Sequence, residues 1–219
     1  MPPPHRMAVL LDLDGTLIDS VPLILASVHH AFGGRARRPT DADWIAGIGT
    51  PLRVQLEEWT DGPEDLAATL ERYRTFQNTH HDRMTRAFPG ALEVVRELNE
   101  RGHRLAVVTG KLAETAAGSL AHVGMRDLFD VIVGANSSTH HKPHPEPVLT
   151  ALERLGTAAD DALFIGDSPL DVKAGNAAGV RTAAALWGAC SREALVAAAP
   201  TYLLESLTAL PALLRRIAR

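Results

Sequence analysis

Residues 8–17 read Ala-Val-Leu-Leu-Asp-Leu-Asp-Gly-Thr-Leu, and this stretch decides the expected fold. The apolar run 8–13 ends at Asp14-Gly15, which predicts a buried strand followed by a turn. Asp12 and Asp14 stand two residues apart, and in an extended chain this spacing returns both side chains to the same face. We therefore expect the first strand to carry two carboxylates at its end.

The sequence beyond residue 89 alternates between apolar runs and helical segments. Strands are expected at about 105–108, 129–133, 162–165, 180–186 and 202–204, and helices at about 90–101, 112–123, 146–155, 169–178, 191–198 and 206–217. Strands that alternate with helices in this way are typical of a parallel sheet covered on both faces. The sequence thus predicts an α/β fold with a Rossmann-like, doubly wound parallel sheet.

The segment that follows the first strand has a different pattern. From residue 20 to about residue 81 it is helical, with breaks at Gly33-Gly34, Pro39, 47–51 and Gly62-Pro63, so four short helices and no strand are expected. We predict that residues 16–84 form a small all-α cap domain, a helical bundle inserted after the first strand. Residues 1–15 and 85–219 would then form the α/β core domain.

Composition limits the expected partners and compartment. Of the 219 residues, 46% are hydrophobic and 22% are charged, and the net charge is −4, so we expect neither a nucleic-acid nor a membrane partner. Cys190 is the only cysteine, which excludes an internal disulfide and fits a reducing compartment. Residues 1–6 have the composition of a leader outside the fold, and the apolar run 7–11 is too short for a signal peptide or a membrane span. We therefore expect a cytoplasmic protein.

Polar residues follow four of the expected strands at their carboxyl ends, where ligands bind to an open parallel sheet. These residues are Asp12 and Asp14 after the first strand, Thr109, Gly110 and Lys111 after the second, His140, His141, Lys142 and His144 after the third, and Asp167 after the fourth, with Asp171 one turn further on. Crowded carboxylates repel one another unless a cation or a proton lies among them. Because oxygen ligands of this kind suit Mg²⁺, the sequence predicts a magnesium site at this edge of the sheet.

Four segments, taken together, resemble the motifs of one protein family. They are Asp12-Leu13-Asp14-Gly15-Thr16-Leu17, Val108-Thr109-Gly110-Lys111, Lys142-Pro143 and Gly166-Asp167-Ser168-Pro169-Leu170-Asp171, which frame the chain from residue 12 to residue 171. In this order the set resembles the haloacid dehalogenase superfamily, in its phosphoglycolate-phosphatase-like branch. The resemblance implies a phosphatase that uses Mg²⁺ and an aspartyl-phosphate intermediate.

The resemblance implies a role for each of the four aspartates. Asp12 is the expected nucleophile, because carboxylates form aspartyl phosphates. Asp14 is the expected general acid for the leaving oxygen and base for the attacking water, and its backbone carbonyl is an expected metal ligand; the alternative for its side chain is a direct metal ligand or a turn-forming acid. Asp167 is expected to bind Mg²⁺ with support from Asp171, unless Asp171 serves only as a first-turn helix acid. Family dehalogenases lack an acid at the position of Asp14, which disfavours a carbon–halogen substrate.

Three further core residues are expected to contact the phosphate. Thr109 and the N–H of Gly110 follow a strand and open a helix, where free N–H groups bind anions. Lys142 is expected to neutralise charge on the nucleophile and the phosphoryl group. Many relatives carry Asn where this chain has Gly110, and the sequence gives no reason for the difference.

One segment of the predicted cap is a candidate substrate loop. Gly47-Ile48-Gly49-Thr50-Pro51 separates two expected helices, and Pro at the first helical position after a Thr cap builds a helix start that can face an anion. The segment resembles the substrate-specificity loop of the family's caps, so Gly49, Thr50 and Arg53 are candidate substrate contacts. A simple turn between helices is the alternative.

Other polar residues are interpreted as solvated. The arginines Arg35, Arg37 and Arg38 are typical of a loop in water. Adjacent histidines do not converge on one ion, so the pairs His29-His30, His80-His81 and His140-His141 are expected on the surface or in loops rather than in a zinc site.

The leading functional hypothesis is the hydrolysis of a small phosphorylated metabolite, a monoester such as 2-phosphoglycolate, by a monomer or a homodimer. An inorganic pyrophosphatase and a phosphomutase are the alternatives within the same superfamily. A catalytically silent binding protein is a further alternative, which loses support because no expected catalytic residue is missing. A closed cap over a small pocket favours metabolites over phosphoproteins.

Overall fold

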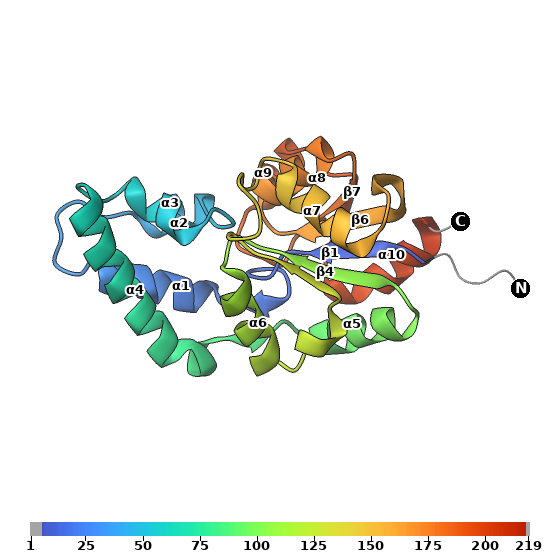
Figure 1. Cartoon of the computed structure of the whole chain (residues 1–219), viewed down its shortest axis with the longest axis horizontal. Helices are drawn as coiled ribbons and strands as arrows, with labels where there is room; N and C mark the ends of the chain where they lie inside the picture. The colour runs from blue at the N-terminus through green and yellow to red at the C-terminus, as the bar shows by residue number, and fades with distance from the viewer. Residues whose placement is uncertain (1–5, 218–219) are drawn as a thin grey trace, which may run out of the picture.

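The computed structural model describes residues 6–217, and its centre is a six-stranded parallel sheet (Figure 1). The strands lie in the order β5-β4-β1-β6-β7-β8. Their bounds are β1 (Ala8–Leu11), β4 (Arg104–Val108), β5 (Val131–Val133), β6 (Ala162–Gly166), β7 (Arg181–Ala185) and β8 (Tyr202–Leu204). Since β1 lies between β4 and β6, Leu11 is opposite both Val107 and Ile165. The predicted parallel sheet is confirmed.

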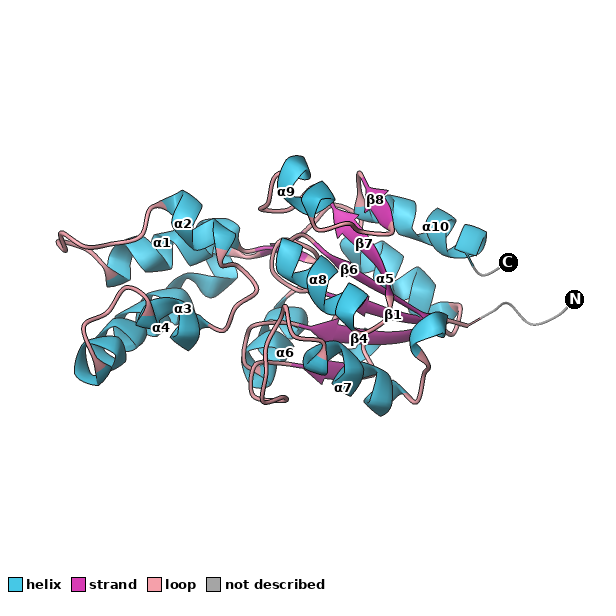
Figure 2. Cartoon of the chain, turned by 90° about the horizontal axis from the view of Figure 1, so that it is seen from above, coloured by secondary structure: helices cyan, strands magenta, loops and turns pink. Residues whose placement is uncertain are grey.

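Alternate residues of β1 pack against helices on opposite faces of the sheet, as the two-residue period of a strand requires. Val9 and Leu11 belong to a buried cluster with residues of α5 (Ala91–Glu100), α6 (Ala113–His122) and α10 (Leu210–Ile217). Ala8 and Leu10 belong to a second cluster with residues of α7 (Glu146–Leu155) and α8 (Pro169–Ala177). The remaining helices of this part are α9 (Arg192–Ala197) and the 3₁₀ turns η1 (Arg126–Leu128), η2 (Ala159–Asp161) and η3 (Leu207–Ala209). Figure 2 shows the resulting layers, which confirm the doubly wound fold.

Four helices stand to one side of the sheet, and we call them the helical insertion (Figure 1). They are α1 (Val21–Ala31), α2 (Asp41–Ala46), α3 (Leu52–Glu57) and α4 (Pro63–Met84), in agreement with the four helices expected. Their shared core contains Val28 of α1, Trp44 of α2, Leu56 of α3 and Tyr73 of α4. The insertion thus has buried contacts of its own, separate from those of the sheet.

A two-stranded antiparallel ribbon joins the insertion to the sheet, and the sequence did not predict it. Its strands are β2 (Ile18–Asp19) and β3 (Arg86–Ala87). Both strands lie outside the segment 20–81, in which no strand was expected, but β2 falls within the predicted all-α segment 16–84. Two-residue strands are too short to show the alternating pattern of a strand. Their pairing also joins residues that are far apart in the chain, which a local pattern does not reveal.

Several predicted boundaries also shift. The first strand ends at Leu11 rather than at residue 13, because the carbonyl of Leu13 accepts hydrogen bonds from the N–H groups of Leu17 and Ile18 and turns the chain. The strand expected at 129–133 begins at Val131, after η1. The expected leader lies outside the described residues except for Arg6, and within residues 6–217 no helix combines the length and apolar character needed to cross a bilayer.

The sheet core allows a direct test of packing. Leu163 of β6 is fully buried, so Leu163→Ala should lower the free energy of unfolding by about 2–5 kcal/mol. Leu149→Ala on α7 is the matched control, because Leu149 is 47% exposed and its truncation should change stability by less than about 0.5 kcal/mol. Urea denaturation of both variants measures the difference, and equal losses would contradict this description of the core.

Candidate active site

The carboxyl ends of four neighbouring strands bring the predicted core residues together. Asp12 continues β1, and its N–H donates to the carbonyl of Ile165 in β6 at 2.9 Å. Thr109 continues β4, and its N–H donates to the carbonyl of Val133 in β5 at 2.9 Å. Asp167 directly follows β6, and Lys142 lies in the loop between β5 and α7. Parallel strands carry these side chains to one edge, as the sequence predicted.

Lys142 lies between two of the buried aspartates and contacts both. Its Nζ lies 3.1 Å from Asp12 Oδ1 and 2.5 Å from Asp171 Oδ1, and it donates to the carbonyl of Val108 at 3.2 Å. All three charged side chains are at least 98% buried. Burial alone would lower the pKa of Lys142, but the charges of Asp12 and Asp171 more than offset this and raise it. The side chain therefore stays protonated among the acids.

Asp167 is held from two sides. Thr16 Oγ1 donates to its Oδ1 at 3.0 Å, and the N–H of Ala189 donates to its Oδ2 at 2.8 Å. Glycine is required beside it, because a Cβ on Gly15 would lie 2.1 Å from Asp167 Oδ2 and one on Gly188 would lie 2.2 Å from Asp167 Cβ. The loop at 188–189, which sequence reasoning did not assign to the site, thus helps to orient this carboxylate.

Asp171 is the helix acid that the sequence offered as one alternative, and it also contacts Lys142. Its carboxylate accepts a hydrogen bond from the N–H of Ser168 at 3.1 Å, which completes a capping box at the start of α8. Its other oxygen contacts Lys142. The residue is therefore both a helix-capping acid and a member of the buried charge cluster.

The side chains present fit a divalent cation. Ligand oxygens of Asp12, Asp167 and Asp171 all lie within 4.8 Å of one another. Three carboxylates and the one ammonium of Lys142 leave two negative charges uncompensated. Asp12 Oδ1 is buried without a hydrogen bond from any described residue, its contact with Lys142 being an ion pair only. An oxygen-only donor set with this charge matches what Mg²⁺ requires.

The same crowding shifts the acidity of two carboxylates. Burial raises the pKa of Asp12 well above its usual range; Lys142 opposes this, while Asp171, Asp167 and Asp14 add to it. Burial and the charge of Asp171 raise the pKa of Asp167 to about 7, despite the hydrogen bonds from Ala189 and Thr16. Both shifts have the sign expected for carboxyl groups buried beside one another.

Asp14 has different partners from the other three aspartates. It is not a member of the carboxylate cluster; its Oδ1 accepts hydrogen bonds from Ser20 Oγ and from Lys111 Nζ, the latter at 2.5 Å. Direct metal contact by the Asp14 side chain is therefore not favoured, whereas contact through its backbone carbonyl stays a prediction. Lys111 was recognised in the sequence only as part of a motif, and no signal there revealed that it reaches Asp14.

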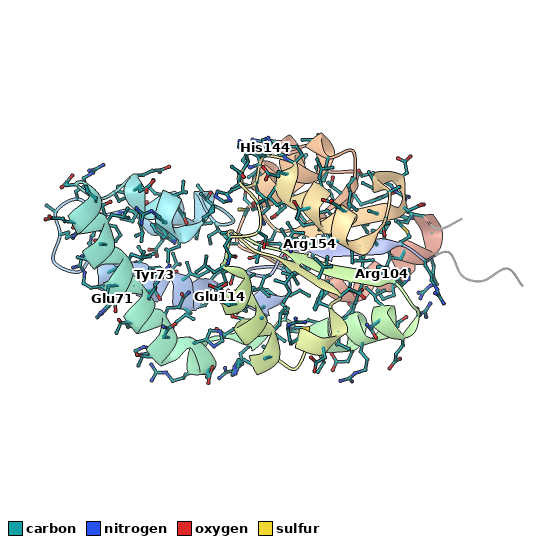
Figure 3. The ribbon with its side chains drawn as sticks, viewed as in Figure 1. Glu71, Tyr73, Arg104, Glu114, His144 and Arg154 are labelled. Atoms are coloured by element: carbon teal, nitrogen blue, oxygen red, sulfur yellow. The ribbon has the colours of Figure 1, made fainter. Side chains whose placement is uncertain are left out.

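A cavity of about 290 Å³ lies between this edge and the helical insertion. Its core side is lined by Asp12, Asp14, Thr109, Gly110 and Lys111. From the insertion come the apolar Ile24, Trp44, Ile48 and Leu52 and the polar Arg53, Tyr73, Arg74, Gln77 and Asn78. Figure 3 labels Tyr73 on α4. Sequence reasoning missed the α4 residues, because nothing in a long polar helix marks which turn faces a cavity.

The predicted substrate loop reaches the cavity, with one correction. Gly49, Thr50 and Arg53 all line it, although Arg53 is ion-paired with Glu57 at 3.2 Å. The expected Thr cap is wrong: Pro51 is the N-cap of α3, and Thr50 makes no capping hydrogen bond. Thr50 belongs instead to a tight turn, in which its N–H donates to the carbonyl of Gly47 at 3.0 Å. Substrate contact by this loop stays a prediction.

The arginines and histidines interpreted as solvated do not line this cavity. Arg35 and Arg37 are ion-paired with Asp65 and Asp61. Of the histidine pairs expected on the surface or in loops, His29, His30 and His140 are exposed, whereas His80, His81 and His141 are half-buried. His144, labelled in Figure 3, is exposed too. The rings of His140 and His144 stack at 4.3 Å between centroids, and both lie within 4.0 Å of Glu146, an arrangement that the sequence did not predict.

The structure explains Gly110 and predicts the effect of replacing it. A Cβ at Gly110 would lie 2.5 Å from the carbonyl oxygen of Gly49, so Gly110→Ala must push the substrate loop away. We expect a loss of about 1–3 kcal/mol in the free energy of unfolding, measured by denaturant titration. Gly118→Ala in α6 is the matched control, because its Cβ meets no atom within 4 Å and should leave stability equal or higher. A Gly110→Ala protein as stable as wild type would show that the loop does not rest on this glycine.

Comparison with known proteins gives the family. A family model described as haloacid dehalogenase-like hydrolase matches residues 9–185. A protein named pyrophosphatase PpaX from Anoxybacillus flavithermus is 34% identical over 207 residues, which cover 94% of this chain and 95% of the relative. Another protein of that name, from Bacillus velezensis, is 36% identical over 205 residues, with 92% and 93% covered.

Solved structures share the fold. A predicted phosphoglycolate phosphatase from Haemophilus somnus superposes with a TM-score of 0.86 at 22% identity, covering 95% of this chain and 98% of that one. A hydrolase from Pseudomonas syringae superposes with a TM-score of 0.87 at 24% identity, covering 98% and 100%. With the family model spanning both Asp12 and Asp167, the chain belongs to the haloacid dehalogenase-like hydrolase family.

Proposed function

We propose that this protein is a magnesium-dependent phosphohydrolase in which Asp12 attacks the phosphorus of a small substrate. The observation that carries the proposal is the environment of Asp12. This carboxylate is buried and lines the cavity, and its Oδ1 has the Nζ of Lys142 at 3.1 Å as its polar contact. Burying a carboxylate with few hydrogen bonds costs free energy, and such groups in folded proteins often have a functional role.

Asp12, Asp167 and Asp171 would hold the Mg²⁺ ion, together with the backbone carbonyl of Asp14. When bound, Mg²⁺ supplies positive charge that stabilises the phosphoryl oxygens during transfer. Lys142 supplies a second positive charge from the protein itself and keeps Asp12 oriented through their contact. Thr109 and the N–H of Gly110 are the proposed hydrogen-bond donors to the phosphoryl oxygens.

The proposed reaction has two displacement steps. In the first, an oxygen of Asp12 forms a bond to phosphorus while the bond from phosphorus to the leaving oxygen breaks, and Asp14 gives that oxygen a proton. In the second, Asp14 takes a proton from a water molecule whose oxygen bonds to phosphorus, and the bond to Asp12 breaks. Inorganic phosphate and free Asp12 result.

Charge stabilisation must supply most of the rate. Hydrolysis of phosphate monoesters can be accelerated up to ~10²¹-fold by enzymes, whereas general acid–base catalysis contributes about 10²–10⁴. Asp14 alone is therefore insufficient. The buried position of Lys142 strengthens its effect, because a charge acts more strongly where water is excluded.

The cavity supports a small substrate. We propose that residues 16–84 act as a cap domain that excludes water over a core formed by 1–15 and 85–219. A volume of about 290 Å³ suits a metabolite-sized phosphate rather than a phosphoprotein segment. A monoester such as 2-phosphoglycolate is the first candidate, and the relatives named pyrophosphatase PpaX favour pyrophosphate as the second.

Metal binding can be measured without turnover. Added Mg²⁺ should raise the thermal unfolding midpoint of the wild type, since a ligand at 100 times its Kd stabilises by about 2.7 kcal/mol. Asp167→Asn removes both a ligand and a repelling charge, so the metal-free variant should be at least as stable as wild type while its response to Mg²⁺ shrinks. Asp127→Asn, at an exposed position in η1, should respond like wild type. An undiminished Mg²⁺ response in Asp167→Asn would remove Asp167 from the metal site.

Replacement of the nucleophile tests the chemistry. Asp12→Asn should lower kcat for every phosphate substrate by at least about a thousandfold, because the amide cannot form the phosphoenzyme. Asp19→Asn, at an exposed position in β2, controls for the loss of a charge nearby and should keep wild-type activity. Full turnover by pure Asp12→Asn protein would overturn the proposed mechanism.

A further inference from the structure

The cavity carries more positive than negative side chains. Its basic residues are Arg53, Arg74 and Lys111, and its acidic residues are Asp12 and Asp14. Asp14 is ion-paired with Lys111, and Asp12 shares Lys142 with Asp171. Arg53 is ion-paired with Glu57, so Arg74 is the basic residue of the lining whose charge is left for an anion that enters the cavity.

Arg74 is the basic residue of the cavity that lacks a partner. Arg53 is ion-paired with Glu57, and Lys111 with Asp14. Within residues 6–217 no hydrogen bond or ion pair of Arg74 is found, and its neighbour one turn earlier, Glu71, accepts a hydrogen bond from Thr75 at 3.3 Å instead. An exposed arginine without an acid, at the wall of a cavity, is free to bind an incoming anion.

Arg74 is also part of a polar stripe on α4. Gln77 and Asn78 follow it at three and four residues, the spacing that places side chains on one face of a helix, and all three line the cavity. Tyr73, directly before Arg74, is buried in the insertion; burial and the charge of Asp14 both raise its pKa, so this turn of α4 lies within electrostatic reach of Asp14. The stripe thus stands on the insertion side of the cavity, across from the core residues proposed to bind the transferred phosphate.

We propose that Arg74 binds a second anionic group of the substrate, located on the leaving group, with Gln77 and Asn78 as flanking hydrogen-bond donors. The substrate class is then small phosphate esters or anhydrides whose leaving group is itself an anion. A guanidinium suits either a carboxylate or a phosphate, because its paired N–H groups match two oxygens of one anion. A cavity of about 290 Å³ beside Trp44 and Leu52 suits a short leaving group. This inference rests on the proposed phosphohydrolase function.

The experiment compares substrates with and without a second negative charge. 2-Phosphoglycolate and 2-hydroxyethyl phosphate have skeletons of similar length, but only the first carries a carboxylate; pyrophosphate adds a leaving group that is a phosphate. We expect Arg74→Gln to lower kcat/KM for 2-phosphoglycolate and pyrophosphate by about tenfold more than for 2-hydroxyethyl phosphate, mainly through a higher KM. Arg74→Lys, which keeps the charge, should recover part of the loss.

Arg83→Gln is the matched control, because Arg83 lies on the same helix outside the cavity lining. Its kcat/KM should change little for all three substrates. An equal effect of Arg74→Gln on the three substrates, or no effect, would overturn the role of Arg74 while leaving the phosphohydrolase proposal intact. A wild-type protein that hydrolyses none of the three with Mg²⁺ present would overturn the proposed function and this inference together.

Discussion

The contact of Lys142 with Asp12 and Asp171 is the interaction on which the site depends. Its Nζ lies 3.1 Å and 2.5 Å from their carboxylate oxygens, in a place that water barely reaches. Without this ammonium, three buried carboxylates would stand against one another, and such an arrangement is strongly destabilising. With it, the charge imbalance falls to what a single divalent cation compensates. The lysine therefore offsets part of the cost of burying Asp12 as a carboxylate.

The order of the strands is what brings these residues together. Asp12, Lys142 and Asp167 are far apart in the chain, but β1 lies between β4 and β6, and all carboxyl ends point to the same edge. Close packing around Asp167 then depends on glycine at residues 15 and 188, where any side chain would overlap the carboxylate. The helical insertion closes the other side of the cavity, where the carbonyl of Gly49 rests against Gly110. The sheet thus aligns the charged side chains, and the inserted helices line the opposite side of the cavity.

The sequence predicted the parts of this structure that follow from local patterns. Alternating apolar and helical segments gave the parallel sheet, and the short motifs after each strand placed Asp12, Lys142 and Asp167 at one edge. What it missed depends on tertiary geometry. Three features were missed: the contact of Lys111 with Asp14, the hydrogen bond from Ala189 to Asp167, and the place of Arg74 in the cavity lining. Each depends on segments that are far apart in the chain, and no local sequence pattern shows that such segments meet. The ribbon of β2 and β3 was not predicted either, because strands of two residues show no alternation in the sequence.

The central claim is that Asp12 becomes phosphorylated at this centre. The most direct test is to quench the wild-type protein in acid during turnover with Mg²⁺ and labelled substrate, then map the label by peptide analysis. The account predicts one acid-stable, alkali-labile acyl phosphate, on the peptide that contains Asp12. Label on a different residue, or a protein that turns over substrate and never carries label, would contradict it.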